Sequence, residues 1–234
     1  MNLKNNKALQ NVWLVGATLG CLLCAILSKS TPIALCCCVC LMIFFISVGY
    51  YDRTSFWFGM FGFAFYAVLM WLLQGYASSV AGAICAIVLA VGGALRSKFS
   101  LAFPHCLKTV TLLLFAGFGV IFSVAIALVL SHFAIPNAWL EAFAATSLVC
   151  GAVLSAFDYV DQWLFYLWSS GVNLAIWIIK TCQSISNLAF VLLWGFCLIN
   201  TLYVLIANFK YFKHKRNVFL IKNIFKTKTN DGGE

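Results

Sequence analysis

Charged residues are scarce in this sequence, and so is proline. Only 9% of the 234 residues carry a charged side chain and three are proline, whereas 64% are apolar and the mean hydropathy is +1.00. A soluble domain is about one quarter charged and about half apolar, so this composition excludes one. Long runs of alternating apolar and polar residues are also missing, which argues against an outer-membrane barrel. Because one membrane-spanning helix needs about 20 apolar residues, the chain has room for about seven or eight.

Acidic residues are absent from the middle of every apolar segment. Glu141, Asp158 and Asp161 all stand near segment ends. Carriers that are coupled to protons generally place an ionisable group on the transport path. The sequence also lacks a phosphate-binding glycine-rich loop and a His-Glu-x-x-His pair. These absences argue against active pumping and against an enzyme, and they predict no cofactor. The remaining interpretation is a protein that lets a solute move passively down its concentration gradient.

Cysteine is abundant by contrast, with eleven residues. Most of them lie inside apolar runs, where cysteine packs as a small hydrophobe. The cluster Cys36-Cys-Cys-Val-Cys40 could hold a soft metal, and this cluster or the pair His105-Cys106 could serve a membrane enzyme. No histidine stands near the cluster, and an enzyme would need catalytic acids within the fold. Packing without a metal is therefore the favoured interpretation.

The basic residues predict how the chain crosses the membrane. If the N-terminus is inside and eight spans alternate, thirteen of the fifteen Lys and Arg residues lie on one side, and only Lys29 and Lys180 lie on the other. Cytoplasmic loops are enriched in Lys and Arg, so both termini are expected in the cytoplasm. The same bias explains the net charge of +9 without a nucleic acid partner. The eight apolar segments are 11–28, 33–50, 55–74, 78–95, 107–131, 139–157, 163–180 and 187–208.

One short phrase occurs twice. Asp52-Arg-Thr-Ser-Phe-Trp57 and Asp158-Tyr-Val-Asp-Gln-Trp163 are 106 residues apart, and Trp71 stands 106 residues before Trp177. Duplicated helical units are typical of carriers, which bind their substrate between the halves. We therefore expect an all-α polytopic membrane protein with two parallel three-helix repeats, a linking helix between them (3+1+3) and an extra N-terminal transmembrane helix. The expected parts are 1–32 (N-terminal tail and extra helix), 33–97 (first repeat), 98–137 (linking helix), 138–208 (second repeat) and 209–234 (basic cytoplasmic tail).

The seventh segment carries a dense polar stripe. Trp163, Tyr166, Ser170, Asn173 and Trp177 are three or four residues apart, so they share one helix face. Their rings could stack on a flat heteroaromatic ligand, while the amide and the hydroxyl bind its polar groups. In the alternative interpretation, a structural subunit without a ligand, the stripe packs against another helix.

Further candidates for the same site come from other segments. The corresponding stripe of the first repeat is much less polar, so the site is expected to lean toward the second repeat. The additional candidates are Trp194, Asn200 and Tyr203 in the last segment, and Trp57, Tyr66, Trp71 and Gln74 in the first repeat.

The spacing around the stripe resembles that of the PnuC family of bacterial vitamin transporters, which have a SWEET-like duplicated fold. The resemblance covers roughly residues 33–215. It includes Glu141-Ala142 placed 22 residues before Trp163, Asp161 two residues before it, Trp177 14 residues after it, and the closing stretch from Leu202-Tyr203 to Phe212-Lys213.

The resemblance implies a nicotinamide riboside uniporter of the bacterial inner membrane. It further implies facilitated diffusion, trapping of the substrate by a cytosolic kinase, and a homotrimer. Nicotinamide riboside carriers of the family have the pattern Trp-x-x-Trp-x-x-x-Asn or Asp, but this chain has Trp163, Tyr166 and Ser170 there, with Asn173 one turn further along the same face. Tyr166 could keep the stacking role. Thiamine, or another vitamin or nucleoside, therefore stays as an alternative substrate.

Overall fold

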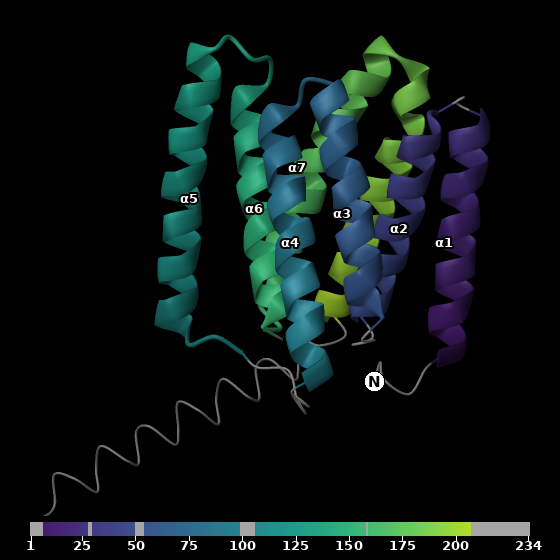
Figure 1. Cartoon of the computed structure of the whole chain (residues 1–234), viewed down its shortest axis with the longest axis horizontal. Coiled ribbons are helices and arrows are strands. Elements are labelled where there is room, and N and C mark those ends of the chain that lie inside the picture. Colours follow the sequence, from purple (N-terminus) through teal and green to yellow (C-terminus); the bar gives the residue numbers. More distant parts are fainter. Residues whose placement is uncertain (1–6, 28–29, 50–53, 99–105, 158, 207–234) are drawn as a thin grey trace, which may run out of the picture.

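The computed structural model describes residues 7–27, 30–49, 54–98, 106–157 and 159–206. These residues form eight long helices and one short 3-10 helix, and the long helices agree with the eight predicted segments to within a few residues (Figure 1). The predicted basic tail, 209–234, lies outside the described residues. The helices are α1 (Lys7–Leu27), α2 (Pro32–Gly49), α3 (Ser55–Leu72), α4 (Tyr76–Lys98), α5 (Thr109–His132), α6 (Ala138–Ala156), α7 (Gln162–Gln183), η2 (Ile185–Asn187) and a last helix, Leu188–Ile206.

The helix ends follow from local sequence. Pro32 is the first residue of α2, where its missing N–H costs no hydrogen bond, and Pro136 lies in the turn before α6. Gln74, Ala134 and Asn137 have positive φ angles of 59°, 52° and 59°, so they reverse the chain in the left-handed conformation. These turns are short, and consecutive helices therefore lie antiparallel and next to each other.

Five of the described helices are long and apolar enough to cross a membrane: α3, α4, α5, α6 and the last helix. The outer surface is apolar as well, and Leu114, Phe118 and Ile121 of α5 are 68–71% exposed. Helix α7 has the length of a span, but its serines, its asparagine and its glutamines make it more polar. Its buried residues include Ser169, Ser170 and Asn173, so the polar side chains in the middle of α7 face the interior of the bundle.

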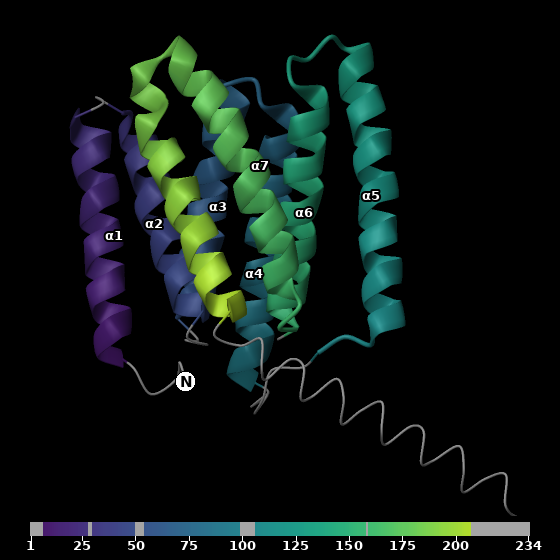
Figure 2. The ribbon, with the colours of Figure 1, turned by 180° about the vertical axis from the view of Figure 1, so that it is seen from behind.

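The helices alternate in direction along the chain. Figures 1 and 2 show that α1 and the last helix have their outer chain ends on the same side of the bundle, as an even number of spans requires. We call this the chain-end side. Helices α2, α3 and α4 repeat the directions of α6, α7 and the last helix, and α5 lies between the two groups in the sequence.

The buried faces of α3 and α7 match at a spacing of 107 residues. The buried residues of α3 are Ser55, Phe56, Gly59, Gly62, Phe63, Tyr66, Leu69 and Met70. Adding 107 to each number gives the complete buried set of α7: Gln162, Trp163, Tyr166, Ser169, Ser170, Asn173, Ile176 and Trp177. All buried residues of α2 except Met42 and Ile46 likewise have buried counterparts in α6 at this spacing.

This spacing corrects the register of 106 taken from the repeated phrase. At 106, buried Trp163 and Trp177 are paired with Trp57 and Trp71, which are 53% and 61% exposed. A shift of one residue rotates a helix face by about 100°, so identical letters in the wrong register point in different directions. Trp57 and Trp71 of α3 therefore lie on the outer surface.

Candidate functional site

Helix α7 turns its polar stripe into the bundle. Trp163, Tyr166, Ser170, Asn173 and Trp177 are at most 1% exposed. The opposite face is open, and Leu164, Trp168 and Ile179 are 39–59% exposed. At the start of the helix, the backbone N–H of Leu107 donates a hydrogen bond of 2.7 Å to the Asp161 carboxylate, which ties α7 to the segment before α5.

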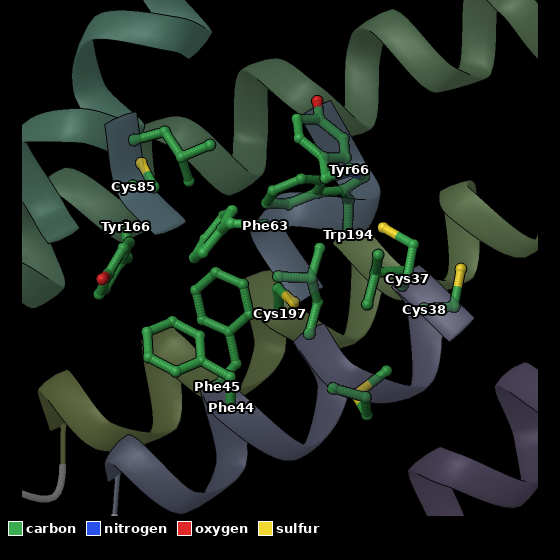
Figure 3. Close-up of a cluster of buried hydrophobic side chains, with 14 of the residues drawn as sticks. Cys37, Cys38, Phe44, Phe45, Phe63, Tyr66, Cys85, Tyr166, Trp194 and Cys197 are labelled. Carbon is green, nitrogen blue, oxygen red and sulfur yellow. The ribbon is translucent and has the colours of Figure 1, made fainter. Parts of the chain in front are cut away.

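Six aromatic side chains from four helices lie together in the interior of the bundle, with Tyr166 of the stripe among them (Figure 3). Phe45 of α2 lies at their centre, with its ring centroid 5.2 Å from that of Tyr166 and 6.0 Å from that of Trp194, in edge-to-face geometry. Such geometry is favourable between aromatic rings. We call this group the aromatic cluster: Phe44 and Phe45 of α2, Phe63 and Tyr66 of α3, Tyr166 of α7, and Trp194 of the last helix.

The chain-end side of the cluster is closed by a hydrogen-bonded group. The hydroxyls of Tyr166 and Ser155 are 2.8 Å apart, and the Ser155 hydroxyl also donates to the Gln162 side chain. The Tyr166 ring lies directly on Gly151, where an added Cβ would be 2.6 Å from the ring. The close approach of α6 leaves no room for a larger side chain at 151, so α6 itself holds Tyr166 in place.

Asn173, further from the chain-end side, joins α7 to α3 and so connects the two groups of three helices. Its side-chain amide donates to the Ser169 carbonyl (2.9 Å) and hydroxyl (3.2 Å), and its carbonyl accepts a 3.1 Å hydrogen bond from the Tyr66 hydroxyl. Tyr66 and Asn173 are counterparts at the spacing of 107. Equivalent positions of α3 and α7 therefore meet each other in the interior.

The side opposite the chain ends carries the charged groups of the site. The Trp177 ring stacks on Phe190 with centroids 4.2 Å apart. The Lys180 ammonium lies 5.4 Å from the centre of the Trp177 ring and 3.7 Å from a carboxylate oxygen of Glu141. Trp177 also stands one turn after Asn173, the partner of the Tyr66 hydroxyl, so this charged group borders the aromatic cluster.

Several buried polar atoms around these rings have no hydrogen-bond partner in the described chain. Buried polar atoms are almost always paired with protein, water or ligand. Such unpaired atoms are candidates for contact with a polar ligand. On α7 and the last helix these atoms are the indole N–H groups of Trp163, Trp177 and Trp194 and the hydroxyls of Ser170, Thr181, Thr201 and Tyr203.

The predicted candidates divide into two groups. The α7 stripe, Trp194 and Asn200 are buried, and Tyr203 is half-buried. Asn200 donates to the Phe45 carbonyl at 3.0 Å. Trp57, Trp71 and Gln74 instead lie on the surface, Gln74 in the turn after α3, so the structure does not bring them to the others. Among the first-repeat candidates, Tyr66 alone reaches the interior.

Sequence reasoning missed Phe44, Phe45, Phe63 and Phe190. The two phenylalanines of α2 stand in a run that is apolar on every side, so no periodic signal marks them. Phe190 could have been found from its place one turn before Trp194 on the last helix. Glu141 belongs to the family spacing and is not among the predicted site residues, although an acid in the first turn of a span is itself a signal of function.

Comparisons with known proteins identify the family and the fold to which this arrangement belongs. Residues 11–212 match the family described as "Nicotinamide mononucleotide transporter". A solved structure, "Crystal structure of the Vitamin B3 transporter PnuC", superposes with a TM-score of 0.73 over 88% of this chain and 92% of that chain, at 18% sequence identity. Among curated protein sequences no match was found. The structural similarity shows a shared fold, and the family match covers most of the sequence. The chain therefore belongs to the PnuC nicotinamide mononucleotide transporter family, and it is a multi-pass membrane transporter rather than an enzyme.

Proposed function

We propose that this transporter carries nicotinamide riboside by facilitated diffusion. The observation that supports this best is the combination of stacked or edge-on aromatic rings with unpaired N–H and hydroxyl groups on the inward faces of α7 and the last helix. The nicotinamide ring of this nucleoside is a flat cation, and a cation is attracted to the face of an indole or a phenol. The ribose hydroxyls and the carboxamide can pair with the unpaired donors and acceptors.

In this proposal each stripe residue has a separate task. Trp163, Tyr166, Trp177 and Trp194 provide ring surfaces, and Ser170 and Asn173 orient the polar groups of the substrate. Tyr166 can replace the tryptophan of the family pattern because its hydroxyl is bonded to Ser155 and its ring rests on Gly151, which fixes its orientation. Asn200 and Tyr203 lie on the last helix, where they border the transport path near the chain-end side. Trp57 and Gln74 are exposed, on α3 and in the turn after it, and take no part in substrate binding in this proposal.

The proposed transport unit has two parallel halves, 33–97 and 138–208, which are joined by 98–137 and preceded by 1–32. The equal burial patterns of α3 and α7 support this division. Both termini, with the basic tail 209–234, are placed in the cytoplasm of a bacterial inner membrane. A homotrimer and trapping of the imported substrate by a cytosolic kinase complete the proposal, as in the family that the chain resembles.

Ser170 offers a sharp test because its hydroxyl is buried and unpaired. Replacing it by alanine removes no protein hydrogen bond, so Ser170→Ala should leave the melting temperature of the substrate-free protein unchanged or raise it. Nicotinamide riboside binding, measured by calorimetry on the purified protein, should weaken severalfold. Ser123→Ala is the matched control, because Ser123 is equally buried but its hydroxyl is bonded within α5.

The ring contribution is tested with two tryptophans. Trp194→Ala should weaken binding roughly tenfold or more, since stacking of a base on an aromatic side chain contributes about 1–3 kcal/mol. Trp168→Ala, on the 59% exposed face of α7, should leave affinity unchanged. Thiamine and riboflavin are measured alongside, and uptake into proteoliposomes should follow the substrate gradient alone. Binding of thiamine but not of nicotinamide riboside would replace the substrate, and binding of no ring compound would favour the structural-subunit interpretation.

A further inference from the structure

Glu141 is a buried acid with an incompletely paired carboxylate. It stands in the first turn of α6 and is only 3% exposed. One carboxylate oxygen is 3.7 Å from the Lys180 ammonium, and the other has no partner. The turn between α3 and α4 covers it, because a Cβ added to Gly75 would lie 3.2 Å and 3.6 Å from the two oxygens. The carboxyl group is therefore enclosed between the two halves, with the Lys180 ammonium as its charged neighbour.

Lys180 is the basic residue next to this carboxyl group, and its ammonium also lies near an aromatic ring. The ammonium lies between the Glu141 carboxylate and the ring of Trp177, 5.4 Å from the ring centre. Phe190 supports the other face of that ring. A carboxylate on one side and an aromatic face on the other are the two features that bind organic cations in proteins. Lys180 thus occupies a site with the chemistry of an organic-cation site.

The contacts of Lys180 are loose enough to be exchanged. The distance of 3.7 Å is well beyond the roughly 2.7–2.9 Å of a charge-assisted hydrogen bond, so the ammonium is near the carboxylate without a tight bond to it. A lysine ammonium sits at the end of a flexible four-carbon stem, and this one is 18% exposed. It can leave toward water, whereas the buried carboxylate cannot, and an unpaired buried charge is costly. The space that the ammonium leaves is then open to a second cation.

We propose that Glu141 and Trp177 form a cation subsite at the mouth of the aromatic interior, on the side opposite the chain ends. In the substrate-free protein the ammonium of Lys180 fills this subsite, and the cationic heteroaromatic ring of an entering substrate displaces it. The subsite rests on the proposed nicotinamide riboside function and adds a basis for charge selectivity to it. Trp177 stands one turn after Asn173 on α7, and Asn173 accepts the hydrogen bond of the Tyr66 hydroxyl, so the subsite borders the aromatic cluster.

The test compares two ligands of nearly the same shape and different charge: nicotinamide riboside, a cation, and its 1,4-dihydro form, which is neutral. Calorimetric dissociation constants are measured for wild type, Lys180→Met and Glu141→Gln. Removing the competing cation should tighten binding of the cationic form severalfold, and removing the carboxylate should weaken it about tenfold. Affinity for the neutral form should change less than twofold in both variants. Lys108→Met removes a positive charge at the chain-end side, far from the subsite, and should change the dissociation constant of neither ligand.

Several outcomes would overturn the subsite. If Lys180→Met binds the cationic form as wild type does, Lys180 does not compete with it. If both ligands change in parallel in Glu141→Gln, the residue acts on structure rather than on charge. Lys180→Gln gives the same comparison should the Met variant not fold. These results leave the proposed function intact when wild type binds nicotinamide riboside, whereas absence of that binding in wild type overturns both proposals.

Discussion

The two groups of three helices have the same burial pattern but different side chains. Along α4 and the last helix, six buried positions match at a spacing of 108 residues. The first group has small residues where the second has large or polar ones: Gly82, Ala86 and Gly92 in α4 correspond to Phe190, Trp194 and Asn200. The pattern of inward positions is thus shared, while these three positions carry larger or more polar side chains in the second group.

One packing motif is reversed between the groups. In the first group a ring of α2 lies on a glycine of α3: a Cβ added to Gly59 would be 2.6 Å from Phe44. In the second group the ring belongs to α7 and the glycine to α6, as Tyr166 lies on Gly151 at the same 2.6 Å. These four positions are counterparts at the spacing of 107. Exchanging ring and glycine brings Phe44 and Tyr166 to within 6.2 Å of each other, so both halves contribute rings to one cluster.

The comparison predicts that the two copies of the repeated phrase differ most at their tryptophans. Trp163→Ala removes a fully buried ring and should lower the free energy of unfolding by about 3–5 kcal/mol. Trp57→Ala removes a ring that is 53% exposed and should change it by less than about 0.5 kcal/mol. Denaturant unfolding in detergent, followed by circular dichroism, measures both. Equal effects would mean that the phrases, and a register of 106, describe equivalent positions after all.

The reversed motif predicts intermediate effects. Gly59→Ala and Gly151→Ala each force a methyl group against a ring and should cost about 1–3 kcal/mol. Gly171→Ala in α7 is the matched control, because nothing lies within 4 Å of its added Cβ and alanine favours a helix by about 1 kcal/mol. The same unfolding experiment should therefore show two destabilised variants and one that is neutral or stabilised. Three similar results would contradict the close contacts.

The sequence predicts most of the helices and the inward face of α7, but not the rings of α2, and the division has a physical reason. The length of an apolar run predicts a membrane span by itself, so the predicted segment 139–157 and the helix Ala138–Ala156 nearly coincide. The inward face of α7 was found because polar residues at helical spacing interrupt an apolar segment. Helix α2 offers no such contrast, and the central ring of Phe45 could not be separated from its neighbours.

Two further features depend on contacts between helices that are distant in the sequence. Glu141 stands near a segment end, where water is expected, but Lys180 and the turn at Gly75 cover it. Trp57 and Trp163 occur in the same phrase, yet helix rotation places one outside and the other inside. Neither difference is encoded in the residues that immediately surround these positions.

The smallest expected effect concerns the point where the two groups meet. Tyr66 and Asn173 are counterparts at the spacing of 107, and their 3.1 Å hydrogen bond joins α3 to α7. A double-mutant cycle with Tyr66→Phe and Asn173→Leu isolates this bond, because each change removes it and the double variant removes it once. Hydrogen bonds between membrane helices contribute about 0.6 kcal/mol on average and up to about 1.7, so the coupling energy should lie in that range.

The cycle also separates structure from transport, because the amide of Asn173 keeps its bonds to Ser169 when Tyr66 is changed. Tyr66→Phe should therefore leave Asn173 oriented and affect stability slightly, while Asn173→Leu should lower both stability and affinity for nicotinamide riboside. Tyr76→Phe serves as the control, since Tyr76 is exposed at the start of α4. A coupling energy near zero would mean that this hydrogen bond does not help to hold the two halves together, and that the Asn173 amide is free to turn toward the substrate.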